Sequence, residues 1–189
     1  MDSNDRHLHW AEIERADILN ANVFTIVRTR RTGPEGQDSD YYVMETPDWV
    51  NVVATTTQEG GDEQFVMVRQ FRHGSKRVSL EFPGGLVEAD EDPAVAVARE
   101  LEEETGFRPE RLRLLGHVNP NPALMGNRCY TYLAEGCTRI SEQNLDTNEA
   151  IEVVLVPPAE IIAGAHDEFD HALMHVALRF YEREKGWDR

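Results

Sequence analysis

The sequence predicts an α+β fold in which strands outnumber helices. The 189-residue chain is long enough to bury a sizeable core. Runs rich in β-branched and aromatic residues alternate with turn residues, and three later stretches favour helix. We expect strands at 23–29, 41–45, 50–57, 64–71, 112–118, 130–134 and 151–156, and helices at 94–105, 159–163 and 169–185. The earliest strands are expected to form a small N-terminal sheet.

The stretch Gly85–Phe107 is interpreted as a loop, a helix and a helix end. Asp92 suits the N-cap and Pro93 the first helical position. Gly106 stands where a helix-ending glycine belongs. The preceding Pro83–Gly85 segment is expected to be a turn that brings backbone close to a ligand.

Glu100, Glu103 and Glu104 have the spacing i, i+3 and i+4, so their carboxylates share one face of this helix. Two like charges about 4 Å apart repel by roughly 4 kcal/mol at an effective dielectric of 20. A hard divalent cation with oxygen ligands removes that conflict, and Mg²⁺ is common where phosphates also bind. The alternative is an acidic helix face exposed to solvent.

The formal net charge of −16 argues against nucleic acid or an anionic membrane as a partner. A small phosphorylated substrate remains compatible, because metals and a few arginines invert the charge locally. Residues 1–12 lack the apolar core of a signal peptide, and no run is long enough to span a membrane. We expect a cytoplasmic protein in which Cys129 and Cys137 are reduced.

The helix and its flanks carry a recognisable pattern: Gly85, five residues, Glu91, seven residues, then RELEEETGF from Arg99 to Phe107. This pattern resembles the complete Nudix box. The resemblance implies an α/β/α sandwich with a mixed central sheet, and hydrolysis of a nucleoside diphosphate linked to another moiety. It also implies that Arg99 orients the carboxylates of the box and pairs with Glu91.

By the same resemblance, Glu100 and Glu104, with Glu103 and the backbone carbonyl of Gly84, are expected to hold Mg²⁺ or Mn²⁺. Such ions neutralise charge on phosphate oxygens and lower the pKa of a bound water.

Two further segments, VRQFRHG at 68–74 and LEFPGG at 80–85, resemble the branch that acts on ADP-ribose and nucleotide sugars. The resemblance implies that Arg72 contacts a substrate phosphate. Pairing of Arg72 with Glu81 is an equal alternative that is compatible with it, and Glu81 is a site candidate that would hold Arg72 or a metal-bound water. Pro122, sixteen residues after Gly106, also resembles this branch. The residues around it depart from the Ser-Pro-Gly often found there, which leaves nucleotide sugars other than ADP-ribose open as substrates.

In that branch an N-terminal extension commonly builds a homodimer. We therefore expect residues 1–48 to be a dimerising β extension and residues 49–189 to be the catalytic domain. Tyr41, Tyr42 and Trp49 are candidates to stack on a nucleobase, with ordinary packing as the alternative for each.

The polar loop 136–150 is long enough to have a function. The branch places its general base in this loop, and Glu149 lies nearest the matching position, with Glu142 and Glu152 as reserves. Arg128 is a candidate for a substrate phosphate or a partner subunit, or a plain surface residue. Two other functions stay open, a nucleotide sensor without turnover and a pyrophosphatase acting on nucleoside triphosphates or dinucleoside polyphosphates.

Overall fold

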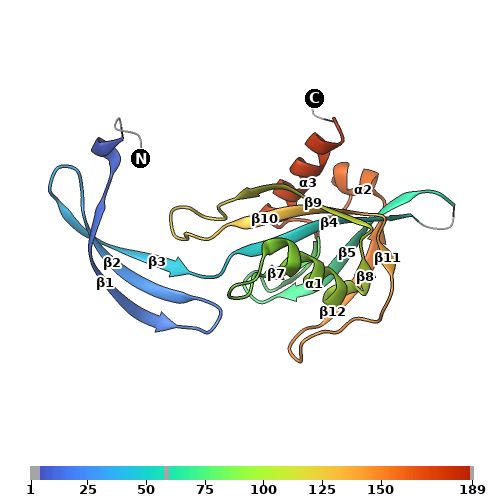
Figure 1. Ribbon diagram of the computed structural model, residues 1–189, viewed down its shortest axis with the longest axis horizontal. Helices are drawn as coiled ribbons and strands as arrows, with labels where there is room; N and C mark the ends of the chain where they lie inside the picture. The colour runs from blue at the N-terminus through green and yellow to red at the C-terminus, as the bar shows by residue number, and fades with distance from the viewer. Residues whose placement is uncertain (1–4, 58–59, 188–189) are drawn as a thin grey trace. The chain divides into compact units, whose positions relative to one another are not determined.

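The computed structural model describes residues 5–57 and 60–187, and the chain divides into two compact units (Figure 1). Unit 1 holds Met1–Pro47 and Asn119–Asn127, and unit 2 holds Asp48–Val118 and Arg128–Arg189. The segment Asn119–Asn127 connects two strands of unit 2 but belongs to unit 1.

Unit 1 is built on a three-stranded antiparallel sheet in the order β1-β2-β3, within the described residues. Its elements are η1 (Arg6–Leu8), β1 (Ala11–Asn20), β2 (Thr25–Thr32) and β3 (Asp38–Glu45). The sequence analysis missed β1, whose charged residues interrupt the alternation that identifies a strand. Ion pairs to β2 hold this exposed strand, including Arg28 to Glu14 at 2.7 Å. The backbone N–H of Met44 donates to the carbonyl of Leu124 at 2.8 Å, which ties Asn119–Asn127 to β3.

Unit 2 is built around a seven-stranded mixed sheet, counted over the described residues. Its strands are β4 (Trp49–Thr57), β5 (Glu63–Arg72), β6 (Arg77–Glu81), β7 (Gly84–Leu86), β9 (Arg111–Val118), β10 (Cys129–Glu135) and β12 (Ile151–Val156). The main order is β12-β5-β4-β10-β9, with β6 paired to β5 and β7 paired to β4. The β4–β10 pair is parallel and the other pairs are antiparallel. The short strands β8 (Phe107–Arg108) and β11 (Thr138–Arg139) pair separately.

Helices cover both faces of this sheet, so unit 2 is the predicted α/β/α sandwich (Figure 1). The helices are α1 (Pro93–Thr105), α2 (Pro158–Ile162) and α3 (Ala172–Glu184). Alternate residues of β4 point to opposite sides: Val52 packs with Leu101 of α1, and Val53 packs with Ala177 of α3. The first six residues of β4, Trp49–Ala54, are apolar except for Asn51, which is typical of a strand covered on both faces.

Local signals located α1 correctly. The carboxylate of Asp92 accepts a bond from the backbone N–H of Ala94 at 2.8 Å, and Gly106 ends the helix in the left-handed region with φ 74°. Two other expectations were wrong. Gly84 belongs to a strand rather than to a turn, because β7 pairs with β4. Helix α3 begins at Ala172 rather than at Phe169.

Within the described residues, no helix is both long and apolar enough to cross a membrane.

Candidate active site

The face of α1 that packs toward β7 carries a buried carboxylate. Glu104 is only 4 % exposed, and its carboxylate accepts a hydrogen bond from the backbone N–H of Gly84 at 2.9 Å. Burial raises the pKa of Glu104 to about 8, and the charges of Glu100 and Glu149 add to the effect. A cation bound beside this carboxylate would stabilise its ionised form against the cost of burial.

The two glycines of β7 let the helix carboxylates approach the backbone. A Cβ atom at Gly85 would overlap the carboxylate of Glu100. A Cβ atom at Gly84 would overlap the backbone carbonyl of Val50 on the neighbouring strand. Glycine is therefore required at both positions, for two different reasons.

Arg99 binds the outer carboxylates of the box. Its guanidinium donates to Glu91 with two bonds of 3.0 Å, to Glu100 at 2.9 Å and to Glu103 at 3.0 Å. It also donates to the backbone carbonyl of Leu86 at 3.2 Å. The predicted pairing of Arg99 with Glu91 is confirmed, and it fastens the loop after β7 to the helix.

The carboxylate oxygens of Glu100, Glu103 and Glu104 are suitable ligands for a divalent cation. In this structure the three carboxylates do not point toward a common position. Over residues 5–57 and 60–187, no group of three or more His, Cys, Asp and Glu side chains is arranged to hold a metal ion. Glu100 and Glu103 face Arg99, whereas Glu104 faces Gly84. Burial, together with neighbouring carboxylates, raises the pKa of both Glu100 and Glu104. A cation with oxygen ligands would relieve this repulsion.

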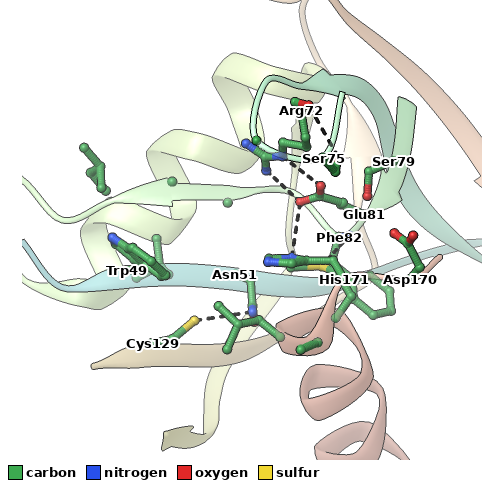
Figure 2. A pocket seen from close by; sticks show the side chains of 18 of the residues that line it. Trp49, Asn51, Arg72, Ser75, Ser79, Glu81, Phe82, Cys129, Asp170 and His171 are labelled. Atoms are coloured by element: carbon green, nitrogen blue, oxygen red, sulfur yellow. Dashed lines mark hydrogen bonds and ion pairs between the residues drawn. The ribbon is translucent and has the colours of Figure 1, made fainter. Parts of the chain in front are cut away.

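Beside these carboxylates lies a cavity of about 640 Å³, a usual size for a small-molecule site (Figure 2). It is lined by residues from β4, the β5–β6 turn, β6, β7, the start of β10 and the start of α3, among them Trp49, Asn51, Arg72, Ser79, Glu81, Gly84, Gly85, Asp170 and His171.

The cavity wall contains an ion pair between the exposed Arg72 and the buried Glu81. Arg72 Nε and Nη2 donate to the two carboxylate oxygens of Glu81 at 2.8 and 2.6 Å, and Glu81 is 1 % exposed. Burial opposes ionisation of Glu81, but the bonds and charge of Arg72 outweigh burial, and the pKa of Glu81 lies below its ordinary value. His171 Nδ1 lies 3.7 Å from the second oxygen of Glu81. The Arg72–Glu81 pairing considered from the sequence is thus present.

Glu149, the residue chosen as general base, is exposed on the loop before β12. Its carboxylate accepts a bond from the backbone N–H of Asp146 at 3.1 Å. The charge of Glu149 contributes to raising the pKa of Glu100, Glu104 and Arg72, so its carboxylate lies within electrostatic reach of all three.

The two reserve acids are engaged elsewhere. Glu142 pairs with Arg139 at 2.8 Å, and Glu152 pairs with Arg69 at 2.8 Å. Of the three loop acids, Glu149 is the one named among the charges that raise the pKa of Glu104. Its role as general base stays a prediction.

Two other candidates differ in position. Trp49 lines the cavity, and its stacking on a nucleobase stays a prediction. Arg128 is exposed and is not among the described residues that line the cavity, and its backbone N–H donates to Asp48 at 2.7 Å. Tyr41 lies in unit 1, where its ring packs edge-on against Trp10.

The sequence analysis assigned no substrate role to Asn51, Ser79, Asp170 or His171, all of which line the cavity. Asn51 had a detectable signal, since it is the one polar residue within the stretch Trp49–Ala54 of β4. Ser79 and His171 are ninety-two residues apart in the sequence, and only the fold brings them to one wall.

Comparison with known proteins gives a consistent result. The model of the NUDIX domain family matches residues 47–176. The chain is 34 % identical over 152 residues to ADP-ribose pyrophosphatase from Bacillus subtilis (strain 168), covering 80 % of each chain. It is 26 % identical over 184 residues to the ADP compounds hydrolase NudE from Escherichia coli (strain K12), covering 94 % of this chain and 97 % of the relative.

A third relative carries a different name. The chain is 32 % identical over 122 residues to a methanol dehydrogenase activator from Bacillus methanolicus, and the match spans 64 % of the length of that relative. Among solved structures, a crystal structure of an ADP compounds hydrolase superposes with a TM-score of 0.78 at 20 % identity, covering 95 % of this chain and 96 % of the other. This likeness concerns the fold.

Proposed function

The chain belongs to the NUDIX domain family and is a pyrophosphohydrolase of nucleoside diphosphate derivatives, so we propose that its substrates are ADP-ribose or other nucleotide sugars. Hydrolysis of the pyrophosphate link releases a nucleoside monophosphate and a sugar phosphate. The observation that supports this proposal best is the buried Glu104 beside Glu100 and Gly84, next to a cavity that contains Arg72.

In this proposal Glu100 and Glu104, with Glu103 and the carbonyl of Gly84, would hold Mg²⁺ or Mn²⁺. When bound, such an ion supplies charge neutralisation on the diphosphate and a more acidic water. Arg99 acts as a positioning residue, because it contacts both Glu100 and Glu103.

The remaining steps belong to side chains around the cavity. Glu81 engages Nε and Nη2 of Arg72, so Nη1 is the donor left for a phosphate oxygen. Glu149 accepts the proton of the attacking water, since its charge already acts at Glu100 and Glu104. Trp49 is proposed to stack on the nucleobase at its end of the cavity.

We also propose that unit 1 forms a homodimer with a second copy of the chain. Strand β1 is exposed along nearly its whole length, and it carries the exposed apolar residues Ile13, Ile18 and Leu19. A single three-stranded layer cannot bury such residues by itself. Light scattering should give twice the chain mass, and a monomer at micromolar concentration would contradict the proposal. The free, buried cysteines support a reducing, cytoplasmic location.

A substrate panel tests the function. Purified protein is assayed with Mg²⁺ on ADP-ribose, GDP-mannose, UDP-glucose, NADH, dinucleoside polyphosphates and a nucleoside triphosphate, with products separated by chromatography. We expect turnover of a nucleotide sugar to a nucleoside monophosphate, and no turnover with EDTA. Preference for the triphosphate or a dinucleoside polyphosphate would refute the substrate class. Tight binding without any turnover would identify a sensor.

A further inference from the structure

Strand register orders the cavity wall from one end to the other. In the β4–β7 ladder, Trp49 lies opposite Leu86 and Asn51 lies opposite Gly84. The chain leads back from Gly84 through Glu81 to Ser79 on β6. The wall therefore runs from Trp49, past the glycines of β7, to Ser79.

The close-up view agrees with this order. Figure 2 shows Trp49 at one end of the cavity and Ser79 with Asp170 at the other, while Glu81 and His171 lie between. A diphosphate bound at Arg72, whose guanidinium is held by Glu81, would leave the Ser79 end for the group on its far side.

Several buried polar atoms of the residues that line this cavity have no hydrogen-bond partner among the described residues. Across the described residues, four buried side-chain atoms lack a hydrogen-bond partner, and three of them belong to residues that line it: Asn51 Oδ1, Ser79 Oγ and His171 Nδ1. Asn51 is 2 % and Ser79 4 % exposed. The Ser79 hydroxyl lies near enough to Glu81 to favour its ionised form, but no described residue meets it with hydrogen-bond geometry.

Such atoms are costly unless a ligand or water satisfies them. The part of the cavity from His171 to Ser79 and Asp170 offers an imidazole nitrogen, a hydroxyl that both donates and accepts, and a carboxylate. Groups of this kind complement a ligand whose polar atoms also both donate and accept, which describes the hydroxyl groups of a sugar.

The charges at this end disfavour a further phosphate. Arg72 is the only arginine or lysine among the described residues that line the cavity, and Glu81 already binds it through two bonds. The carboxylate of Asp170 adds negative charge, and its partner Arg77, at 3.3 Å, lies outside the lining. A neutral group rich in hydroxyls therefore fits better than a phosphorylated one.

We propose that Ser79, Asp170 and His171 form the subsite for the sugar beyond the diphosphate, and that they set the preference for a hydroxyl-bearing group. This inference rests on the proposed function, because it assigns one half of that substrate to one end of the same cavity.

The test compares two substrates that differ only in this group, ADP-ribose and a simple alkyl ester of ADP. Wild-type protein should prefer ADP-ribose in kcat/KM. Ser79→Ala and His171→Ala should each lower kcat/KM for ADP-ribose about three- to tenfold, the effect of one lost hydrogen bond, while the alkyl ester changes less than about twofold. Ser39→Ala, a hydroxyl deletion on β3 of unit 1, is the matched control and should leave both values unchanged.

Thermal unfolding supplies an independent readout. Ser79→Ala removes a buried hydroxyl that has no hydrogen-bond partner among the described residues, so the Tm should change little. His171 precedes α3 without a side-chain cap bond, so His171→Ala should also keep the fold.

Three results would overturn the inference. Equal losses on both substrates would mean that the side chains act through Arg72 and Glu81 rather than on the sugar. Unchanged kinetics in both variants would mean that the sugar binds elsewhere. Absence of wild-type turnover on every diphosphate substrate would refute the proposed function itself, and the subsite with it.

Discussion

Replacing Glu104 by glutamine tests the acidic cluster through stability as well as through turnover. Glutamine keeps the side-chain shape and an oxygen that accepts the 2.9 Å bond from Gly84, but it carries no charge. In protein freed of metal, burial raises the pKa of Glu104 from 4.5 to about 8. The folded state therefore keeps a proton that the unfolded chain releases at lower pH. This contribution to stability is full below about pH 4.5 and is lost as pH rises toward 8.

The size of the effect follows from the shift. One pKa unit corresponds to about 1.4 kcal/mol. Between about pH 5.5 and about pH 8.5, wild-type protein should therefore lose roughly 3 kcal/mol of unfolding free energy relative to Glu104→Gln. For a chain of this size, that difference corresponds to about 6–12 °C in Tm.

Scanning calorimetry in EDTA at the two pH values measures this difference. Glu102→Gln is the matched control, because Glu102 lies on the same helix and pairs with Arg108 at 2.9 Å on the exposed side. With Mg²⁺ present, Glu104→Gln should lower turnover by orders of magnitude, whereas Glu102→Gln should not. A constant Tm difference between wild type and Glu104→Gln at both pH values, or wild-type turnover in that variant, would refute the reasoning.

Three further outcomes are expected. Gly85→Ala should fold but lose most activity, because the new methyl group displaces the carboxylate of Glu100. Circular dichroism reports whether the variant is folded, and a turnover assay reports its activity. Arg72→Ala should lower the unfolding free energy by about 1–3 kcal/mol, because it removes both hydrogen bonds to the buried Glu81. Adding Glu81→Gln should restore most of the stability but no activity, as measured by urea unfolding and a turnover assay. Burial raises the pKa of Cys129 to about 12, so its thiol should resist iodoacetamide at pH 8 until the protein is denatured, as mass spectrometry can check.

The sequence located features whose causes are local. Helix α1 was predicted because its cap, its apolar spacing and its final glycine all lie within the segment itself. The pairing of Arg99 with Glu91, eight positions apart, followed from the motif that runs from Gly85 to Phe107. Strand β7 was missed because its three residues form a strand only when β4 lies beside them. A two-glycine segment carries no strand preference of its own.

The cavity was harder to predict than the helix. Its wall joins the ends of several elements, and the polar residues there have no common spacing. Ser79 lies in an ordinary edge-strand sequence, and His171 directly precedes α3 without a surrounding motif. Only long-range contacts identify Ser79 and His171 as neighbours of Glu81.

The division of the chain has a practical consequence for anyone who wishes to separate its halves. The polypeptide passes between the units at three places, after Pro47, after Val118 and after Asn127. Deleting residues 1–47 would remove Met44, whose backbone N–H donates to the carbonyl of Leu124 in the β9–β10 connection. That connection would then lose its partner strand. The proposed homodimer is therefore better tested by point replacements on β1 than by truncation.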